Sequence, residues 1–238
     1  YSRLALKRAR QLLMAHRDDK ARKVLNQLTT SHADFELPQR WLEALDKPRI
    51  GRVVLTDCES QEDVDALELQ VVQRGFWLDE QKPVLVSLAR GEEVATWNEE
   101  VALQERLCLP GLAPVLAHGK AKSGLHYMVL PPEGKPLTEV IRRRKMRPRS
   151  ALRIAMDGVA ILGGFTNAGV LLSEFGMASV YGDGNGRLWL PTLRGARLAT
   201  ATEAAQAHQH LALQWVEETV RWATGRRLDV GLQKKLKE

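Results

Sequence analysis

The sequence lacks several features that would define a class of protein at once. It has only two cysteines, Cys58 and Cys108, which are too few for a disulfide framework or a CxxC-type metal site. No window approaches the run of about 18 apolar residues that a membrane-spanning helix needs, and no signal-peptide pattern opens the chain. These absences argue against membrane-spanning and fibrous proteins, and they lead us to expect a reducing, cytoplasmic setting without a membrane partner.

Neither sign of charge dominates the composition. The 238 residues include 35 Lys and Arg against 29 Asp and Glu, a net charge of +6. This excess favours acidic partners in general but is too small to indicate nucleic-acid binding by itself. Apolar residues make up 44% of the chain and charged residues 27%, as in a globular protein of one large or two small domains. Because the first residue is Tyr1 and not methionine, we expect a piece of a longer chain.

The first 45 residues have a helical period. Two apolar stripes predict two helices, separated by a polar turn at residues 16–19, and a third helix follows. This spacing resembles one tetratricopeptide-type repeat with an added helix. Since a single repeat cannot bury its own apolar face, we expect the segment to pack on another part of the protein; a plain helical extension is the alternative. The apolar positions are Leu4, Ala5, Ala9, Leu12, Leu13, Ala21, Val24, Leu25, Leu28, Phe35, Trp41, Leu42 and Leu45.

A different pattern begins after the linker at residues 47–49, where Pro48 disfavours helix in the residue before it. Runs rich in β-branched residues predict strands there, and helical periods return later. The predicted elements are strands at 50–56, 67–72 and 83–89, a helix at 92–108, a strand pair within 109–130, and helices at 137–144, 149–168 and 202–224. We therefore expect an α+β protein in which a small sheet domain precedes a helical one.

Three passages carry a family resemblance. Residues 107–119 are similar to L-x-H-P-N-I-V-x-V, residues 127–137 to Y-L-V-M-E-Y-V-x-G-x-x-L, and residues 149–170 to a long helix ending in H-x-x-G-V. In this order they resemble a eukaryotic-type protein kinase domain, of the kind that bacteria also use. The resemblance implies a two-lobed fold. The expected domains are a helical segment at 1–48, a kinase-like β lobe at 49–131 and a truncated helical lobe at 132–238.

The nucleotide-binding groups that this resemblance implies are altered. Protein kinases cover the phosphates with a glycine-rich loop and hold them with a strand lysine paired to a helix glutamate. Residues 56–65 contain no glycine and five carboxylates, which would repel a triphosphate. Ser87 stands where the lysine belongs. Glu100 keeps the helix position without that partner, so we interpret it as a solvated residue.

The catalytic-loop positions are altered as well. The passage at residues 169–180 places Leu172 and Ser173 at the histidine and arginine, Glu174 at the base aspartate, and Ser179 at the metal-binding asparagine. Glutamate is one methylene longer than aspartate, and a misplacement of about 1 Å costs roughly a hundredfold in rate. We therefore expect no catalytic use of Glu174.

The metal-binding D-F-G sequence is replaced by residues 192–194, where Arg194 would oppose a magnesium ion. Asp183 lies nearby, but glycines and an asparagine at 183–187 predict a hairpin turn, and turn chemistry explains the aspartate better than metal binding. Only about 44 residues follow Arg194, which is short for the helical lobe of a kinase.

These losses predict a pseudokinase. We expect no enzyme activity, no cofactor and no bound metal, and a role as a scaffold or regulator that binds another protein. One alternative is an atypical nucleotide-dependent phosphotransferase that relocates its lysine and its base. Its replacement cations would have to be Lys82, Arg90 or Arg194.

A dense basic run is the candidate partner-binding site. It could contact an acidic protein or, as a third hypothesis, nucleic acid with a steep salt dependence. No aromatic residues that would stack on bases lie within it, so nucleic acid is the weakest hypothesis. The residues are Arg142, Arg143, Arg144, Lys145, Arg147 and Arg149.

The histidines and tryptophans do not point to a metal site or a binding site. His208 and His210 would hold a metal only on a strand, because on a helix two residues at this spacing point apart. The six tryptophans fall mostly on faces predicted to be buried, and only Trp77 is expected to be exposed, on a hairpin.

Overall fold

The computed structural model describes residues 2–32, 34–69, 72–121, 123–132, 134–142, 147–183 and 186–224. They form an α+β protein with eight α-helices and a mainly antiparallel arrangement of strands. The chain divides into two compact units. Unit 1 is Tyr1–Arg90 with Leu116–Pro132, and unit 2 is Gly91–Val115 with Glu133–Glu238. Each unit has its own apolar core.

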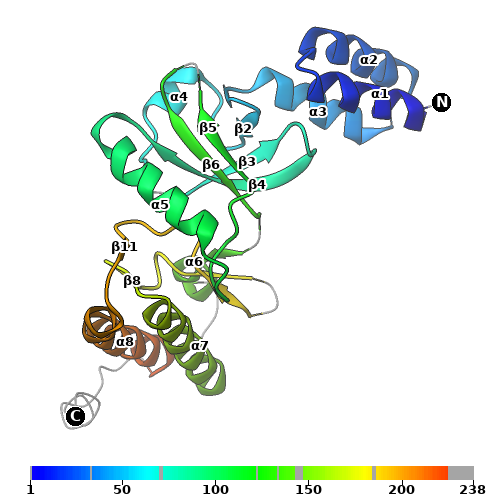
Figure 1. Ribbon diagram of the computed structural model, residues 1–238. Helices are drawn as coiled ribbons and strands as arrows, with labels where there is room; N and C mark the ends of the chain where they lie inside the picture. The colour runs from blue at the N-terminus through cyan, green and yellow to red at the C-terminus, as the bar shows by residue number, and fades with distance from the viewer. Residues whose placement is uncertain are drawn as a thin grey trace. The chain divides into compact units, whose positions relative to one another are not determined.

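Unit 1 begins with three helices, α1 (Ser2–Met14), α2 (Asp18–Ser31) and α3 (Glu36–Asp46), drawn in blue in Figure 1. The predicted helical segment is therefore present. The predicted turn at residues 16–19 is too long, because Asp18 and Asp19 already form the first turn of α2. Carboxylates in a first turn are stabilised by the positive end of the helix dipole, which the sequence analysis did not use.

A six-stranded antiparallel sheet follows the helices, in the order β1-β2-β3-β4-β6-β5. A short helix, α4 (Gln61–Asp65), lies in the chain between β2 and β3. The strand predicted at residues 67–72 is wrong, because the paired strand starts later and residues 70 and 71 lie outside the described residues. The strands are β1 (Arg49–Ile50), β2 (Val53–Leu55), β3 (Gln73–Trp77), β4 (Lys82–Ala89), β5 (Ala117–Lys120) and β6 (His126–Leu130).

The alternation along β2 explains why the helices pack on the sheet. Val53 and Leu55 point into the core on one face of the sheet, whereas Val54 between them belongs to the cluster that contains α1, α2 and α3. On the chain from β3, Leu78 joins Val54 in that helical cluster. The expectation that the helical segment needs another surface is therefore met within unit 1.

Unit 2 is built from helices and very short strands. It starts with a 3-10 turn, η1 (Gly91–Glu93), and the helix α5 (Val94–Arg106). Later come β7 (Lys135–Pro136), α6 (Leu137–Arg142), α7 (Pro148–Asn167), β8 (Val170–Leu171), β9 (Tyr181–Gly182), β10 (Leu188–Trp189), β11 (Arg197–Leu198) and α8 (Ala201–Thr224). β9 pairs with β7 and β10, and β8 pairs with β11.

The helices α7 and α8 lie side by side (Figure 1). The fully buried indole of Trp215 on α8 lies against Gly158 on α7, where a Cβ atom would come within 2.1 Å of the indole nitrogen. That nitrogen donates hydrogen bonds to the carbonyls of Ile154 and Ala155, both at 3.2 Å. The missing side chain at Gly158 therefore allows the close approach of the two helices.

Candidate functional site

Ser87, the residue at the expected lysine position, lies in the middle of β4 and is 1% exposed. It pairs in register with Met128 of β6. Val86 and Leu88, its neighbours along β4, belong to the apolar core on the other face of the sheet. A buried hydroxyl at this position has no positive charge with which to hold a phosphate.

The cations near Ser87 in the sequence have other partners. The Lys82 ammonium lies 5.3 Å from the centre of the Trp77 ring, a cation–π distance. Arg90 forms an ion pair with Asp65 at 3.2 Å. Trp77 itself ends β3 at the hairpin to β4, as predicted, but its side chain is half-buried and not exposed.

The acidic segment at residues 56–65 forms a capped helix start instead of a phosphate loop. The Ser60 side chain accepts a hydrogen bond from the Asp63 amide, and the Asp63 carboxylate accepts from the Ser60 and Glu59 amides. These amide hydrogen bonds lower the pKa of Asp63. Lys47 donates to Glu59 at 2.8 Å. The backbone amides of Glu59, Ser60 and Asp63 are thus engaged by the Asp63 carboxylate and the Ser60 hydroxyl and not available to a phosphate.

Glu100 on α5 is not the solvated residue that the sequence suggested. It is half-buried, and its carboxylate accepts a hydrogen bond of 2.5 Å from the Gly195 amide. Burial raises the pKa of Glu100, whereas the Gly195 amide and the Arg194 guanidinium act in the opposite direction. Within unit 2, Glu100 therefore anchors the segment after β10 through the Gly195 amide.

The residues of unit 2 that the sequence resemblance placed at catalytic-loop and metal-binding positions are exposed or engaged in local structure. Glu174 is exposed. The Ser179 hydroxyl accepts from the Gly176 amide at 3.0 Å and donates to the Gly176 carbonyl at 3.1 Å, which closes a turn. The Asp183 carboxylate accepts from the Arg187 amide at 2.8 Å in the connection between β9 and β10. The prediction that Asp183 serves a hairpin turn is confirmed.

Two buried polar residues of unit 2 make contacts that the sequence did not predict. Gln104 continues the stripe of Trp97 and Val101 on α5, and its side-chain amide donates to the carbonyls of Ala113 at 2.9 Å and Pro191 at 2.8 Å. Both hydrogen bonds tie surrounding loops to the helix. A polar residue that continues an apolar stripe was the available signal.

His208 is the second of these buried residues. It follows Ala204 on the buried face of α8, where its Nε2 accepts from the Leu172 amide at 3.1 Å. The Nδ1 atom therefore carries the proton and donates to the Thr166 hydroxyl at 2.8 Å. Burial lowers the pKa of His208. His208 and His210 lie on one helix, as the sequence argument against a metal pair requires, and His210 is exposed.

The basic run is only partly described. Arg143, Arg144 and Lys145 lie outside the described residues, and Arg142 is the last residue of α6. Arg147 precedes α7 and Arg149 lies in its first turn, and both are exposed. The described part of unit 2 brings neither Arg147 nor Arg149 to another candidate site and leaves both side chains exposed.

The outer face of α7 carries exposed apolar side chains at helical spacing. Leu152 and Met156 are 63% and 64% exposed, and Val159 follows one turn later. Exposed apolar stripes of this kind are typical of surfaces that contact other proteins. Trp222 at the end of α8 is also exposed, so the expectation of buried tryptophans does not hold for it.

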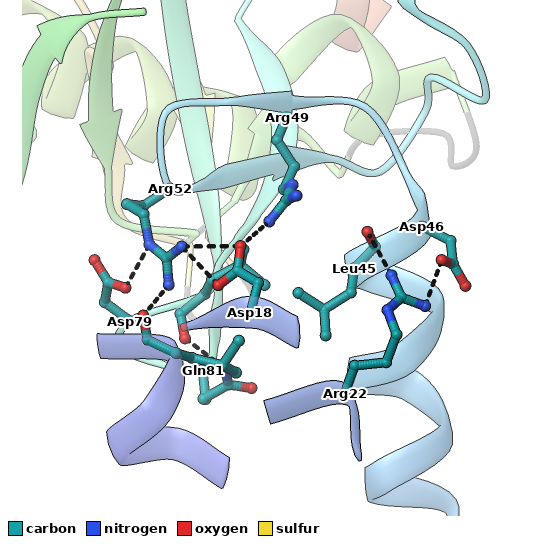
Figure 2. Close-up of polar contacts among 10 residues, drawn as sticks. Asp18, Arg22, Leu45, Asp46, Arg49, Arg52, Asp79 and Gln81 are labelled. Carbon is teal, nitrogen blue, oxygen red and sulfur yellow. Dashed lines mark hydrogen bonds and ion pairs between the residues drawn. The ribbon is translucent and has the colours of Figure 1, made fainter. Parts of the chain in front are cut away.

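A charged cluster joins the helices of unit 1 to the sheet (Figure 2). Arg52, between β1 and β2, bonds to Asp18 at 3.1 Å, to Asp79 at 2.8 Å and to the carbonyl of Leu13 at the end of α1. Arg49 also bonds to Asp18, at 2.5 Å. Partial burial acts to raise the pKa of Asp18, but the hydrogen bonds from the two arginines outweigh it and lower the pKa.

This junction is a structural clamp in which the charged side chains pair with one another. The Arg52 side chain is 14% exposed and Asp18 is 28% exposed. Beside it, Arg22 of α2 bonds to Asp46 at 2.7 Å and to the Leu45 carbonyl at 3.2 Å, across to α3. The cluster therefore holds α1, α2 and α3 in one orientation on the sheet.

The described residues offer few candidates for a metal site or for a reactive thiol. No three His, Cys, Asp or Glu side chains there gather closely enough to hold a metal ion. Cys58 is buried and Cys108 is exposed, and both are free thiols. Burial raises the pKa of Cys58, and three nearby carboxylates act in the same direction, which makes its thiol a poor nucleophile. None of the described helices is long and apolar enough to cross a membrane.

The comparisons with known proteins name no relative. No protein-family model matches the chain, and a search of the curated proteins finds no match. The resemblances to a protein kinase and to a tetratricopeptide repeat therefore stay predictions from the sequence.

Proposed function

We propose that this chain is a catalytically inactive, protein-kinase-like module that binds another protein as a scaffold or regulator. The observation that carries the proposal is the buried Ser87 in the central strand β4. A kinase holds the phosphates of ATP with a lysine at this position, and a serine side chain is too short and uncharged to replace it.

The order of the elements supports the kinase-like part of the proposal. The strands β1, β2, β3 and β4, with the short helix α4 between β2 and β3, precede α5, and the strand pair of β5 and β6 follows it. The order predicted from the sequence was three strands, a helix and two strands, so β1 as a separate strand and α4 are additions to it. The helices α6, α7 and α8 then follow, as expected of a helical lobe.

The contacts of the other residues at expected nucleotide-binding and catalytic positions support the proposal that the module is inactive. Glu100 accepts a backbone hydrogen bond from Gly195, and Ser179 closes a turn. Of the three replacement cations that an atypical phosphotransferase could use, Lys82 lies over Trp77 and Arg90 pairs with Asp65. The exposed apolar stripe at Leu152, Met156 and Val159 supports a binding role instead.

Isothermal titration calorimetry of the chain with ATP, with and without magnesium, tests this proposal. We expect no heat of binding and no rise in melting temperature at millimolar nucleotide, because no phosphate-binding cation is expected. Magnesium-dependent binding at micromolar concentration would overturn it. Arg194→Ala, compared with Lys120→Ala at an exposed position on β5, would then show whether the third candidate cation holds the phosphates.

A further inference from the structure

The positive charge of the chain is concentrated in its first two helices. Residues 1–32 hold eight Lys and Arg against two Asp, a net charge of +6, which equals the net charge of the whole chain. The remaining residues, 33–238, hold 27 basic and 27 acidic side chains. The hairpin of α1 and α2 therefore offers an acidic partner a net electrostatic attraction.

Most of these cations have no partner among the described residues. Arg22 bonds to Asp46, Arg10 lies 3.8 Å from Glu80 on the exposed surface, and both acids are outside the hairpin. Among the described residues, the other six cations of the hairpin have neither an ion pair nor a side-chain hydrogen bond, and all six are exposed. They are Arg3, Lys7, Arg8, Arg17, Lys20 and Lys23, and we call them the hairpin cations.

Two large apolar side chains are exposed among the hairpin cations. Leu4 is 73% exposed and Met14 is 52% exposed, and both lie on α1. The apolar side of the same helix, at Ala9 and Leu13, is fully buried in the core of unit 1. Leu4 and Met14 are therefore additional to that core and lie on the outer surface with the cations.

The clamp around Arg52 makes this surface well defined. Arg52 bonds to Asp18 at the start of α2, as Figure 2 shows, and also to the Leu13 carbonyl at the end of α1. Both helices are thus held against the sheet before any partner binds. A surface that is already ordered loses less entropy on binding than a flexible basic tail.

We propose that the hairpin cations, together with Leu4 and Met14, bind an acidic amphipathic segment of another protein. Its carboxylates would pair with the cations, and its apolar side chains would cover Leu4 and Met14. This inference rests on the proposed function, since it names the chemistry of the partner that the module binds.

Other acidic partners fit this surface less well. Residues 2–32 contain no Phe, Trp or Tyr, so the hairpin offers no ring on which a base could stack. A membrane-surface helix inserts its apolar face between lipids, but the apolar faces of α1 and α2, at Leu13 and Leu25, are buried against the protein. A protein segment supplies both charge and apolar contact.

Fluorescence anisotropy with a labelled probe tests the proposal. The probe is a 21-residue peptide with glutamate on one helical face and leucine on the other, measured with the full chain at 50 and 300 mM salt. The hairpin variant is Lys7→Glu, Lys20→Glu and Lys23→Glu. The matched control is Lys120→Glu, Lys135→Glu and Arg187→Glu, exposed positions outside the hairpin. Both variants lower the net charge by the same amount.

We expect the hairpin variant to bind the peptide at least about tenfold more weakly than wild type, and the control variant to change the affinity less than about threefold. Leu4→Ser should weaken binding further at 300 mM salt, where ion pairs are screened. Equal loss in the two variants, or no binding by wild type, would overturn the proposal. So would tighter binding of a 20-base-pair DNA duplex or of vesicles with 30% phosphatidylserine.

The peptide-binding experiment and the nucleotide titration test the two proposals independently. A chain that binds ATP but also binds the peptide through the hairpin would contradict the proposed inactivity and leave the partner surface intact. A chain that binds neither would contradict the partner surface alone.

Discussion

The two units join their helices by different physical means. In unit 1, α1 and α2 meet the sheet through a charged cluster centred on Arg52, beside the apolar contacts of Val54 and Leu78. In unit 2, α7 and α8 meet through Trp215 and Gly158, where an indole occupies the space of a missing side chain. The first junction depends on paired charges and the second on shape.

This difference predicts different sensitivities. A charged junction weakens with salt and with acid, because its pairs are screened and its carboxylates become protonated. A packed apolar junction tolerates both conditions but not a change of volume. Substitutions at the two junctions can therefore be chosen so that each one affects its own unit, and hydrogen exchange reports the two units separately.

The largest effect is expected at Gly158. In Gly158→Ala the new methyl group would overlap the Trp215 indole and break its hydrogen bonds to Ile154 and Ala155. We expect a loss of about 3 kcal/mol or more in the free energy of unfolding of unit 2, measured by denaturant unfolding and by hydrogen exchange of α7 and α8.

The control for this prediction is Gly163→Ala on the same helix. A Cβ atom there would meet nothing within 4 Å, so alanine should stabilise α7 by about 0.5–1 kcal/mol. Equal destabilisation by both substitutions would mean that the contact with Trp215 is not what holds the helices together.

Arg52→Met should give the next largest effect, in unit 1. The substitution leaves Asp79 without a hydrogen bond from Arg52 and removes the cation that bridges Asp18 and Leu13. We expect a loss of about 2 kcal/mol in unfolding free energy, since the pair is only partly buried. Faster hydrogen exchange in α1 and α2 should accompany it, whereas α7 and α8 keep their protection. Uniform loss across both units would contradict a local clamp.

A smaller effect is expected from Asp18 and from acid. The folded pKa of Asp18 lies below its unfolded value of about 3.8, so its stabilising contribution is present above that pH and is lost as the pH falls through the folded pKa. Asp18→Asn should therefore cost about 1 kcal/mol at pH 7, and this cost should shrink as the pH falls below about 3.8. Urea unfolding at several pH values measures this, and a pH-independent cost would exclude the charge as the cause.

The smallest effect is expected at His208, in unit 2. Burial lowers its folded pKa below the unfolded value of about 6.5, so the unfolded chain binds the proton first and stability decreases as the pH falls from 7 through 6.5. A proton on Nε2 would also displace the hydrogen bond from the Leu172 amide. His208→Gln should remove this part of the pH dependence, as seen in unfolding curves at pH 7.5, 6.5 and 5.5.

The helices and the α+β class could be predicted from the sequence, because the apolar residues of long helices such as α2 and α7 recur with the helical period. The paired strand β3 was misplaced. Residues 67–72 have the composition of a strand, but pairing with β2 and β4 occurs at Gln73–Trp77, and pairing partners are not encoded in local composition.

Some features of the candidate sites could likewise be predicted from the sequence, and others could not. The absence of a lysine at Ser87 and the turn at Asp183 follow from residue type and local spacing, so the sequence was sufficient for both. The interpretation of Glu100 failed because its partner, the Gly195 amide, lies 95 residues away in the chain. Gln104 and His208 also depend on distant backbone groups, at Pro191 and Leu172.

The sequence by itself determined the α+β class, the helical hairpin and its net charge of +6, because these depend on composition and on neighbours within one helix or strand. Only the tertiary structure decided that Arg52 joins Asp18 to Asp79, that Trp215 lies on Gly158, and that the hairpin cations have no ion pair among the described residues. These features depend on residues far apart in the chain, and only folding brings such residues within the few ångströms over which hydrogen bonds and packing act.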